Sequence, residues 1–114
     1  MTYDVAVWKH SGPLSDEEAS AEYDRRIELS EENYESDRRL PPCAELTELF
    51  VRMRARFADD EPPWEDDPGD AADGEFVYLT MTWSQGPSVV EYIAQLARSL
   101  GLVVYDPQVE AVVS

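Results

Sequence analysis

The segment formed by residues 76–105 constrains the fold more than any other part of the chain. Residues 76–83 alternate between two faces that both carry large side chains, which predicts a central β-strand. After a turn at residues 84–87, residues 89–100 place apolar side chains at helical spacing, and Gly101 follows where helices commonly end in a left-handed conformation. Residues 102–105 predict another strand. Two strands joined through a helix by short links predict a right-handed crossover between parallel strands.

The first half of the chain predicts one strand and two helices. Residues 3–8 alternate between two faces, as a strand does. Ser15 and Glu18 have the spacing of a capping box, and we expect the helix that they begin to end at about residue 34. Pro42 suits the first turn of a second helix, since the residues after it repeat apolar side chains at helical spacing.

These elements follow one another in the order β-α-α-β-α-β. We expect one domain, residues 1–114, of the α+β class or a small α/β domain. Its predicted form is a two-layer sandwich, with a sheet of three or four strands and helices mainly on one face. The tail, residues 109–113, predicts either a short edge strand or a frayed end. A hydrophobic fraction of 43% supports a folded domain, because an acidic disordered chain would hold fewer apolar side chains.

The charge of the chain excludes two classes of partner. The chain has 25 Asp and Glu residues against 9 Lys and Arg residues, a net charge of −16. Nucleic acids and anionic membranes attract basic surfaces, so we expect neither as a partner. The acidity has two explanations: a surface that attracts a basic protein, or a genome-wide bias in a salt-adapted host.

The chain has few residues suited to catalysis or metal binding. Its single cysteine, Cys43, cannot form an internal disulfide, and no Cys and His set has zinc spacing. Neither Cys43 nor the single histidine, His10, stands beside a partner that would make it catalytic, so we expect no enzyme, cofactor or metal. The start lacks a signal sequence, and no apolar run approaches the ~20 residues of a membrane span. We therefore expect a cytoplasmic protein.

An acidic segment, residues 59–75, is the first candidate site. It holds three Pro and two Gly residues, and we expect it to be a long loop without regular structure. Its spacing departs from that of a calcium-binding loop, so its carboxylates predict a protein-binding surface. Trp64 either packs back on the domain or anchors a partner. The candidate partner-binding residues are Glu61, Trp64, Glu65, Asp66, Asp67, Asp70 and Asp73.

The ends of the two predicted parallel strands are the second candidate site. Ligands of open α/β sheets bind at the carboxyl ends of strands. The residues at these ends are Trp83, Ser84, Gln85, Tyr105, Asp106 and Gln108. They form either a ligand site or turns that only cap the strands.

Several motifs of the chain resemble those of a known group of proteins. The motifs are the YDVAVW start, Pro63-Trp64, the run VYLTMTWS from residue 77 to 84, and LGLVVYDPQ from residue 100 to 108. They resemble a family of small acidic bacterial proteins of the actinobacterial type. In size and acidity, these proteins are similar to immunity proteins of toxin–antitoxin and polymorphic toxin systems. The resemblance implies no catalytic residue.

Two functions follow from these observations as hypotheses. The first is a protein-binding domain, most concretely an immunity protein that neutralises a basic toxin, with the acidic segment as the contact surface. The alternative is a small-molecule-binding or enzymatic α+β domain with its site at the strand ends near Ser84 and Asp106. The sequence leaves the oligomeric state open.

Overall fold

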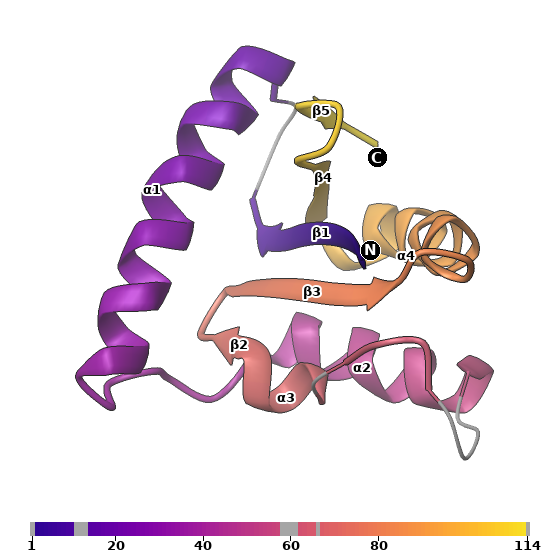
Figure 1. Cartoon of the computed structure of the whole chain (residues 1–114), viewed down its shortest axis with the longest axis horizontal. Helices are drawn as coiled ribbons and strands as arrows, with labels where there is room; N and C mark the ends of the chain where they lie inside the picture. The colour runs from indigo at the N-terminus through magenta and orange to yellow at the C-terminus, as the bar shows by residue number, and fades with distance from the viewer. Residues whose placement is uncertain (1, 11–13, 58–61, 66, 114) are drawn as a thin grey trace.

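A computed structural model describes residues 2–10, 14–57, 62–65 and 67–113, and shows a five-stranded sheet with helices on both faces (Figure 1). The strand order is β2-β3-β1-β4-β5, and each neighbouring pair is antiparallel. The α+β class is confirmed, with five strands rather than three or four. In chain order, the elements are β1 (Thr2–Lys9), α1 (Asp16–Glu35), α2 (Ala44–Phe57), α3 (Pro68–Ala71), β2 (Ala72–Asp73), β3 (Phe76–Thr82), α4 (Gly86–Leu100), β4 (Leu102–Asp106) and β5 (Ala111–Val112).

The central strand of the sheet is β1, which pairs with β3 on one side and β4 on the other. Both partners run antiparallel to β1, so β3 and β4 are parallel to each other, as predicted. They are not neighbours, however, because β1 lies between them. The position of β1 matches its burial, since the run from Val5 to Trp8 is fully buried on both faces of the sheet. The tail forms the short edge strand β5.

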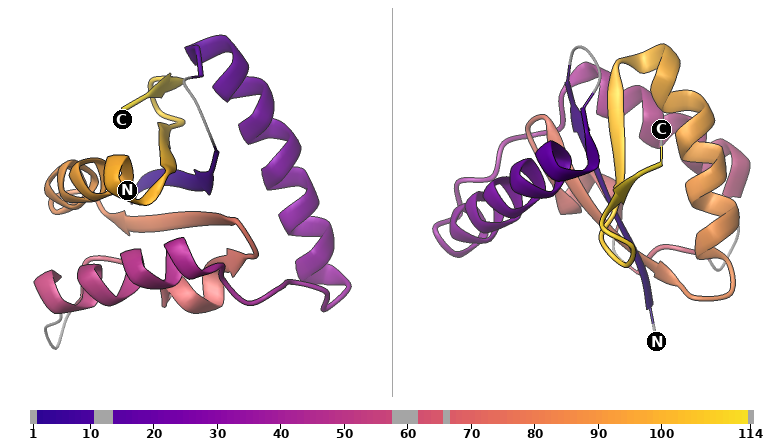
Figure 2. Two further views of the ribbon diagram at one scale, coloured as in Figure 1. Left: turned by 180° about the vertical axis from the view of Figure 1, so that it is seen from behind. Right: turned by 90° about the horizontal axis from the view of Figure 1, so that it is seen from above.

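Helices cover the two faces of the sheet unequally. In the right-hand view of Figure 2, α2 and α4 lie on one side of the strands and α1 lies on the other. The expectation of helices mainly on one face holds for α2 and α4, while α1 forms a third layer. The alternation along β1 explains this arrangement, because Val5 and Val7 face α2 and α4, whereas Ala6 and Trp8 face α1.

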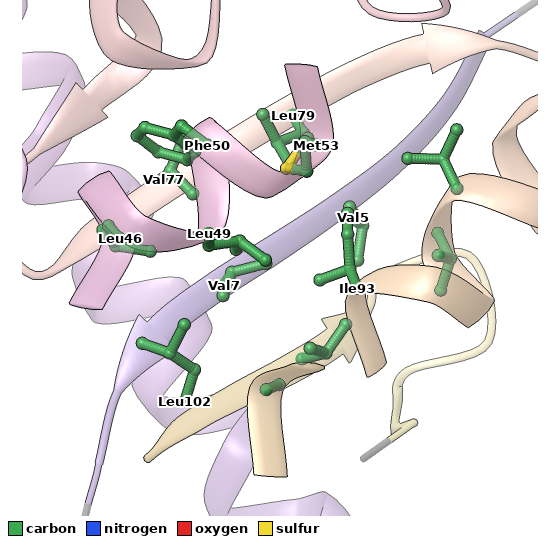
Figure 3. Close-up of a cluster of buried hydrophobic side chains, with 14 of the residues drawn as sticks. Val5, Val7, Leu46, Leu49, Phe50, Met53, Val77, Leu79, Ile93 and Leu102 are labelled. Carbon is green, nitrogen blue, oxygen red and sulfur yellow. The ribbon is translucent and has the colours of Figure 1, made fainter. Parts of the chain in front are cut away.

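The core beneath α2 and α4 is mainly aliphatic, although it includes the ring of Phe50 (Figure 3). In α2, apolar residues recur at helical spacing, so that Leu46, Leu49 and Met53 all turn toward the sheet and are fully buried. Ile93 of α4 is equally buried in the same cluster. Each such side chain stabilises the fold by about 2 kcal/mol through removal of apolar surface from water.

The core beneath α1 is smaller and aromatic. The ring of Trp8 lies 5.9 Å from that of Tyr105 and 6.4 Å from that of Phe76. Tyr23 of α1 completes the layer, with its ring 5.0 Å from that of Tyr105. The indole N–H of Trp8 is buried without a hydrogen-bond partner among the described residues. This face is therefore held by ring contacts rather than by interdigitated aliphatic side chains.

The ends of the long helices agree closely with the sequence signals. The Ser15 hydroxyl accepts a hydrogen bond from the Glu18 N–H, and the Glu18 carboxylate accepts one from the Ser15 N–H, which confirms the capping box. Gly101 ends α4 with a φ of 71°, as predicted. The second helix begins at Ala44 rather than at Pro42, and the N–H of Cys43, just before it, donates to the Gly74 carbonyl.

The acidic segment is more regular than predicted, and the expectation of a loop without regular structure is wrong. It contains α3 and β2, and Trp64 forms a β-bridge with Met81. Backbone groups of the acidic segment form hydrogen bonds along the edge of β3. The Glu65 N–H, for example, donates to the Thr80 carbonyl at 2.8 Å. Pro68 opens α3 in the first turn, where a missing N–H costs nothing.

Candidate functional site: an acidic helix and the cleft beside it

Helix α1 is, together with the acidic segment of residues 59–75, one of the two most negative parts of the chain. Between Asp16 and Glu35, it carries nine carboxylates and two arginines. The other long helices are close to neutral: α2 has two glutamates and three arginines, and α4 has one of each. The sequence contains this acidic run, but a charged helix face is usually only solvated, so the run by itself does not predict a site.

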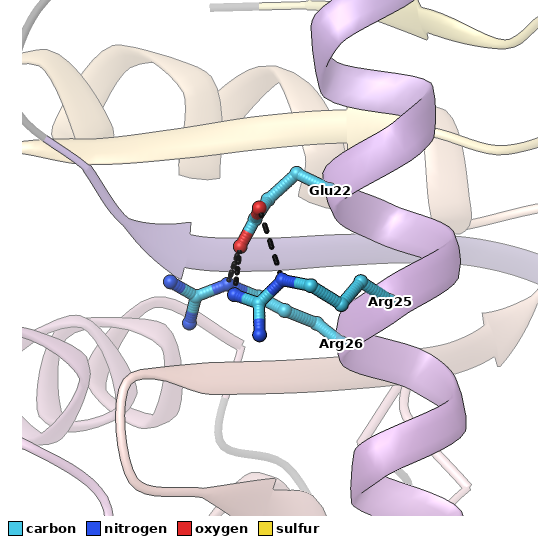
Figure 4. Close-up of polar contacts among 3 residues, drawn as sticks. All are labelled: Glu22, Arg25 and Arg26. Carbon is cyan, nitrogen blue, oxygen red and sulfur yellow. Dashed lines mark hydrogen bonds and ion pairs between the residues drawn. The ribbon is translucent and has the colours of Figure 1, made fainter.

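The two arginines of α1 leave most of its charge uncompensated. Both Arg25 and Arg26 bind one carboxylate, that of Glu22, at 2.5 Å (Figure 4). The hydrogen bond from Arg25 lowers the pKa of Glu22 below its ordinary value. In the described part of the chain, none of the other eight carboxylates of α1 forms an ion pair. The outer face of α1 is therefore a strongly negative surface.

The inner face of α1 is a thin apolar stripe. Ala19 is fully buried, while Tyr23 and Ile27 are half-buried against the sheet. The hydroxyls of Ser20 and Tyr105 lie 2.6 Å apart, which adds a hydrogen bond between the helix and β4. Because few side chains of α1 are buried, the helix does not seal the whole face of the sheet.

A cleft of about 540 Å3 opens between α1, α3 and β3. On the α1 side, its wall holds the ring of Tyr34 and the carboxylate of Glu31. On the α3 side, it holds the carboxylates of Asp67 and Asp70. The cleft is within the size range of ligand sites, about 300–1,000 Å3.

A chain of hydroxyl groups lies along β3 at the cleft. The Tyr78 hydroxyl donates a hydrogen bond to Oδ2 of Asp4 at 2.8 Å. Burial raises the pKa of Tyr78, and the hydrogen bond to Asp4 raises it further. Burial also raises the pKa of Tyr23, whose hydroxyl interacts with that of Tyr78. Both phenols are therefore neutral at pH 7 and present hydroxyls rather than charges.

Asp4 anchors this chain of hydroxyls to the sheet. Its backbone N–H donates to Oε1 of Gln108, and its carbonyl accepts from Nε2 of Gln108, both at 2.8 Å. Oδ1 of Asp4 is buried and has no hydrogen-bond partner among the described residues. Oδ2 thus depends on Tyr78 for its hydrogen bonding, and Oδ1 has no donor within the part of the chain that the structure describes.

Two guanidinium groups already contact residues that line the cleft, that of Arg39 from within the lining and that of Arg54 from outside it. That of Arg39 lies 4.8 Å from the centre of the Tyr34 ring, and its Nε donates to the Ser30 carbonyl at 3.2 Å. That of Arg54 donates to Oδ1 of Asp67 at 2.7 Å. The same carboxylate caps α3 through the Gly69 N–H, and the Gly69 and Arg54 hydrogen bonds lower the pKa of Asp67.

The predicted partner-binding residues are divided between several environments. Asp67 and Asp70 line the cleft, and Glu65 is exposed beside β3. Trp64 is only 9% exposed and packs into the aliphatic core, so packing back on the domain is the arrangement observed. Asp73 accepts hydrogen bonds from Asn33 at 2.8 Å and from the Leu40 N–H at 2.9 Å. Glu61 and Asp66 lie outside the described residues.

The strand ends form a hydrogen-bonded group around Tyr3. The Tyr3 hydroxyl donates to Oδ2 of Asp106 at 2.8 Å, and its ring lies 5.5 Å from the half-exposed ring of Trp83. Burial raises the pKa of Tyr3, with Asp106 adding to the rise. The Gln108 N–H donates to Oδ1 of Asp106 at 2.9 Å. Asp106, although 4% exposed, is therefore satisfied by its neighbours.

The remaining residues of the strand-end candidate lie apart from this group. Tyr105 faces α1 on the opposite side of the sheet, because neighbouring residues of a strand point to opposite faces. Ser84 and Gln85 are exposed in the turn that leads into α4. A hollow of about 490 Å3 lies beside Tyr3, against Val90 of α4 and Val113 of the tail.

The described residues, 2–10, 14–57, 62–65 and 67–113, contain neither a membrane-spanning helix nor a metal-binding cluster. None of their helices has the length and apolar character needed to cross a bilayer. No three of their His, Cys, Asp or Glu side chains are arranged to hold a metal ion.

Comparison with protein-family models, curated proteins and solved structures gave no match to this chain. The resemblance of its sequence motifs to small acidic bacterial proteins therefore stays a prediction. The roles of its residues rest on geometry and charge alone.

Proposed function

We propose that the protein is a protein-binding domain whose partner is a basic protein. The observation that carries the proposal is the exposed charge of α1, nine carboxylates against two arginines that share Glu22. A strongly negative surface accelerates encounter with a cationic partner and repels acidic competitors. The contact surface in this proposal is α1 together with Asp67 and Asp70 across the cleft, rather than the acidic segment alone.

The most concrete form of the proposal is an immunity protein that neutralises a basic toxin. With 20 residues, α1 is about 30 Å long, so its nine carboxylates follow one another about every 3 Å along the axis. The phosphates of one DNA strand are spaced by about 3.4 Å. An acidic helix of this density resembles the polyanion that the active site of a nuclease binds, which supports a toxin of that class as the partner.

The test is affinity capture from host lysate with two charge variants. One variant neutralises α1: Asp24→Asn, Glu28→Gln, Glu32→Gln and Glu35→Gln. The matched control removes four exposed carboxylates elsewhere: Glu65→Gln, Glu75→Gln, Glu91→Gln and Glu110→Gln. Wild type and control are expected to capture one stoichiometric basic protein, released by salt, and the α1 variant is expected to lose it.

Two results would contradict the proposal. Equal capture by both variants would show that α1 is not the contact surface. A stoichiometric partner that is acidic, or that resists elution at 1 M salt, would show that charge does not select it. Circular dichroism of each variant establishes that lost capture is not lost folding.

A ligand site at the strand ends is the second candidate function. The hollow of about 490 Å3 beside Tyr3 supports it, since apolar side chains and the polar groups of Glu91 and Arg98 line the same space. A small-molecule screen by thermal shift tests it, because a ligand that binds only the folded state raises Tm. The hits are expected to lose their effect in a Tyr3→Ala variant, and an unchanged effect would exclude this site.

A further inference from the structure

The walls of the cleft carry more negative than positive charge. Three carboxylates line it, those of Glu31, Asp67 and Asp70, against the guanidinium of Arg39. Arg54 compensates Asp67 from outside the lining. Within the residues that the structure describes, neither Glu31 nor Asp70 forms an ion pair. An organic cation entering the cleft would therefore meet two free carboxylates, one on each side.

The remaining surface of the cleft consists of aromatic rings and hydroxyls. Tyr23 and Tyr78 are half-buried, and their rings are tilted by 34° with centres 6.3 Å apart. Their phenol oxygens accept hydrogen bonds, and the faces of phenol rings attract cations. Since the Tyr78 hydroxyl donates its own hydrogen to Asp4, its oxygen can act toward a ligand only as an acceptor, and it also interacts with the Tyr23 hydroxyl.

Two contacts within the fold involve guanidinium groups at residues of these walls. Arg39 places a guanidinium over the Tyr34 ring, and Arg54 places one on the Asp67 carboxylate. The two kinds of surface, ring face and carboxylate, thus already bind planar guanidinium groups of this chain. An ammonium group is a more strongly hydrated point charge, and it gains less from a flat ring and a forked carboxylate.

We propose that the cleft between α1 and α3 receives an arginine side chain of the basic partner. The guanidinium lies against the rings of Tyr23 and Tyr78 and pairs with Glu31 and Asp70. This inference rests on the proposed function and adds the residue type that the partner must present. A free volume of about 540 Å3 holds an arginine side chain together with part of its neighbours.

The experiment is a titration of the 15N-labelled protein, followed by NMR, with Nα-acetyl-arginine amide. The matched probe is Nα-acetyl-citrulline amide, which has nearly the same shape and no charge. Arginine amide is expected to shift the backbone amides of Ile27, Ala71 and Thr80 in a saturable way, and citrulline amide is expected to leave them in place. Equal shifts with both probes, or arginine shifts spread over α1 without the cleft, would overturn the inference.

A pair of variants tests the carboxylates. Glu31→Gln with Asp70→Asn is expected to weaken arginine amide binding about three- to fivefold, because it removes two partly exposed charge pairs. The control, Asp24→Asn with Glu32→Gln, changes the charge equally outside the cleft and is expected to retain the wild-type affinity within about twofold. Equal weakening by both pairs would overturn the inference, since only general acidity would then matter.

An arginine-rich nonapeptide separates this inference from the proposed function. If the α1 charge variant loses the peptide but the cleft variant keeps wild-type affinity, the acidic surface stands and the arginine site is wrong. If arginine amide still saturates the cleft while the α1 charge variant binds the nonapeptide as wild type does, the site stands and the surface proposal is wrong.

Discussion

The two faces of the sheet solve the same packing problem in different ways. On one face, the nearly neutral helices α2 and α4 bury aliphatic side chains such as Leu49 and Ile93. On the other face, the acidic helix α1 covers aromatic rings and hydroxyls with only a thin stripe of apolar side chains. The first face is built for stability. The second leaves a cleft and a negative surface, which shows that helix composition decides where this fold has room for a partner.

Truncation of core residues should expose the contrast most strongly. Leu49→Ala removes a fully buried side chain of α2, and we expect it to lower the free energy of unfolding by about 3 kcal/mol. Ile27→Ala, on the half-buried inner face of α1, is expected to cost about 1 kcal/mol. Urea unfolding measures both values, and equal losses would refute the distinction between the faces.

Close approach of α4 to the sheet gives the second largest effect. Gly86 begins α4 directly against Tyr3, and a Cβ at this position would overlap the Tyr3 side chain, with its Cγ only 2.6 Å away. Gly86→Ala is therefore expected to destabilise the protein by about 2 kcal/mol. Ser88→Ala is the control, because Ser88 is exposed two residues later in the same helix. This substitution should change stability by less than about 0.5 kcal/mol. A thermal melt compares them, and an equally stable Gly86→Ala variant would show that α4 is not tightly seated.

Loss of one hydroxyl tests the polar character of the α1 face. Tyr78→Phe leaves Oδ2 of Asp4 without its donor, and we expect a loss of about 1–2 kcal/mol. Tyr92→Phe removes a weak, exposed hydrogen bond of 3.4 Å on α4 and is expected to cost almost nothing. Chemical denaturation at pH 7 separates the two, and equal effects would mean that Asp4 does not need Tyr78.

The same tyrosine makes a prediction for alkaline pH. The pKa of Tyr78 is raised in the folded protein, whereas in the unfolded chain it is near 10. Its contribution to stability is therefore complete below about pH 10 and is lost as the pH rises above that value. Wild type is expected to lose stability between pH 10 and 11 more steeply than Tyr78→Phe. Parallel curves would contradict the raised pKa.

The smallest effect concerns the first turn of α1. Because α1 has little buried surface, we expect its capping box to contribute a large share of its stability. The well-buried α4 has no side-chain cap. Ser15→Ala is expected to cost about 1 kcal/mol. Hydrogen exchange should show faster opening of the first turn of α1, and unchanged exchange would show that packing alone holds it.

Local signals in the sequence predicted elements well and their arrangement less well. The capping box at Ser15 and the helix end at Gly101 are satisfied by neighbouring residues, so the sequence contains all that determines them. The place of β1 between β3 and β4 depends on pairing with distant strands, which alternation alone does not specify. One signal was present: apolar residues on both faces of β1, which mark a central strand.

The acidic segment and the cleft escaped prediction for a different reason. Proline and glycine argue against a central strand, but they permit extended pairing along the edge of β3, as Trp64 shows. The cleft is formed by α1, α3 and β3, three elements whose proximity no local pattern encodes. Its carboxylates, Asp67 and Asp70, were identified as candidates, whereas Glu31 and the tyrosines were not.

The central position of β1 also determines when the sheet can assemble during synthesis. Val7 pairs with Val104, 97 residues later in the chain, and β3 is not complete until residue 82. An apolar strand that is made early therefore waits for both of its partners until most of the chain has left the ribosome. Such long-range pairing slows folding and leaves the strand open to wrong partners in the meantime. We expect the strong charge of α1, the next helix after β1, to oppose association of the waiting segment through mutual repulsion between chains.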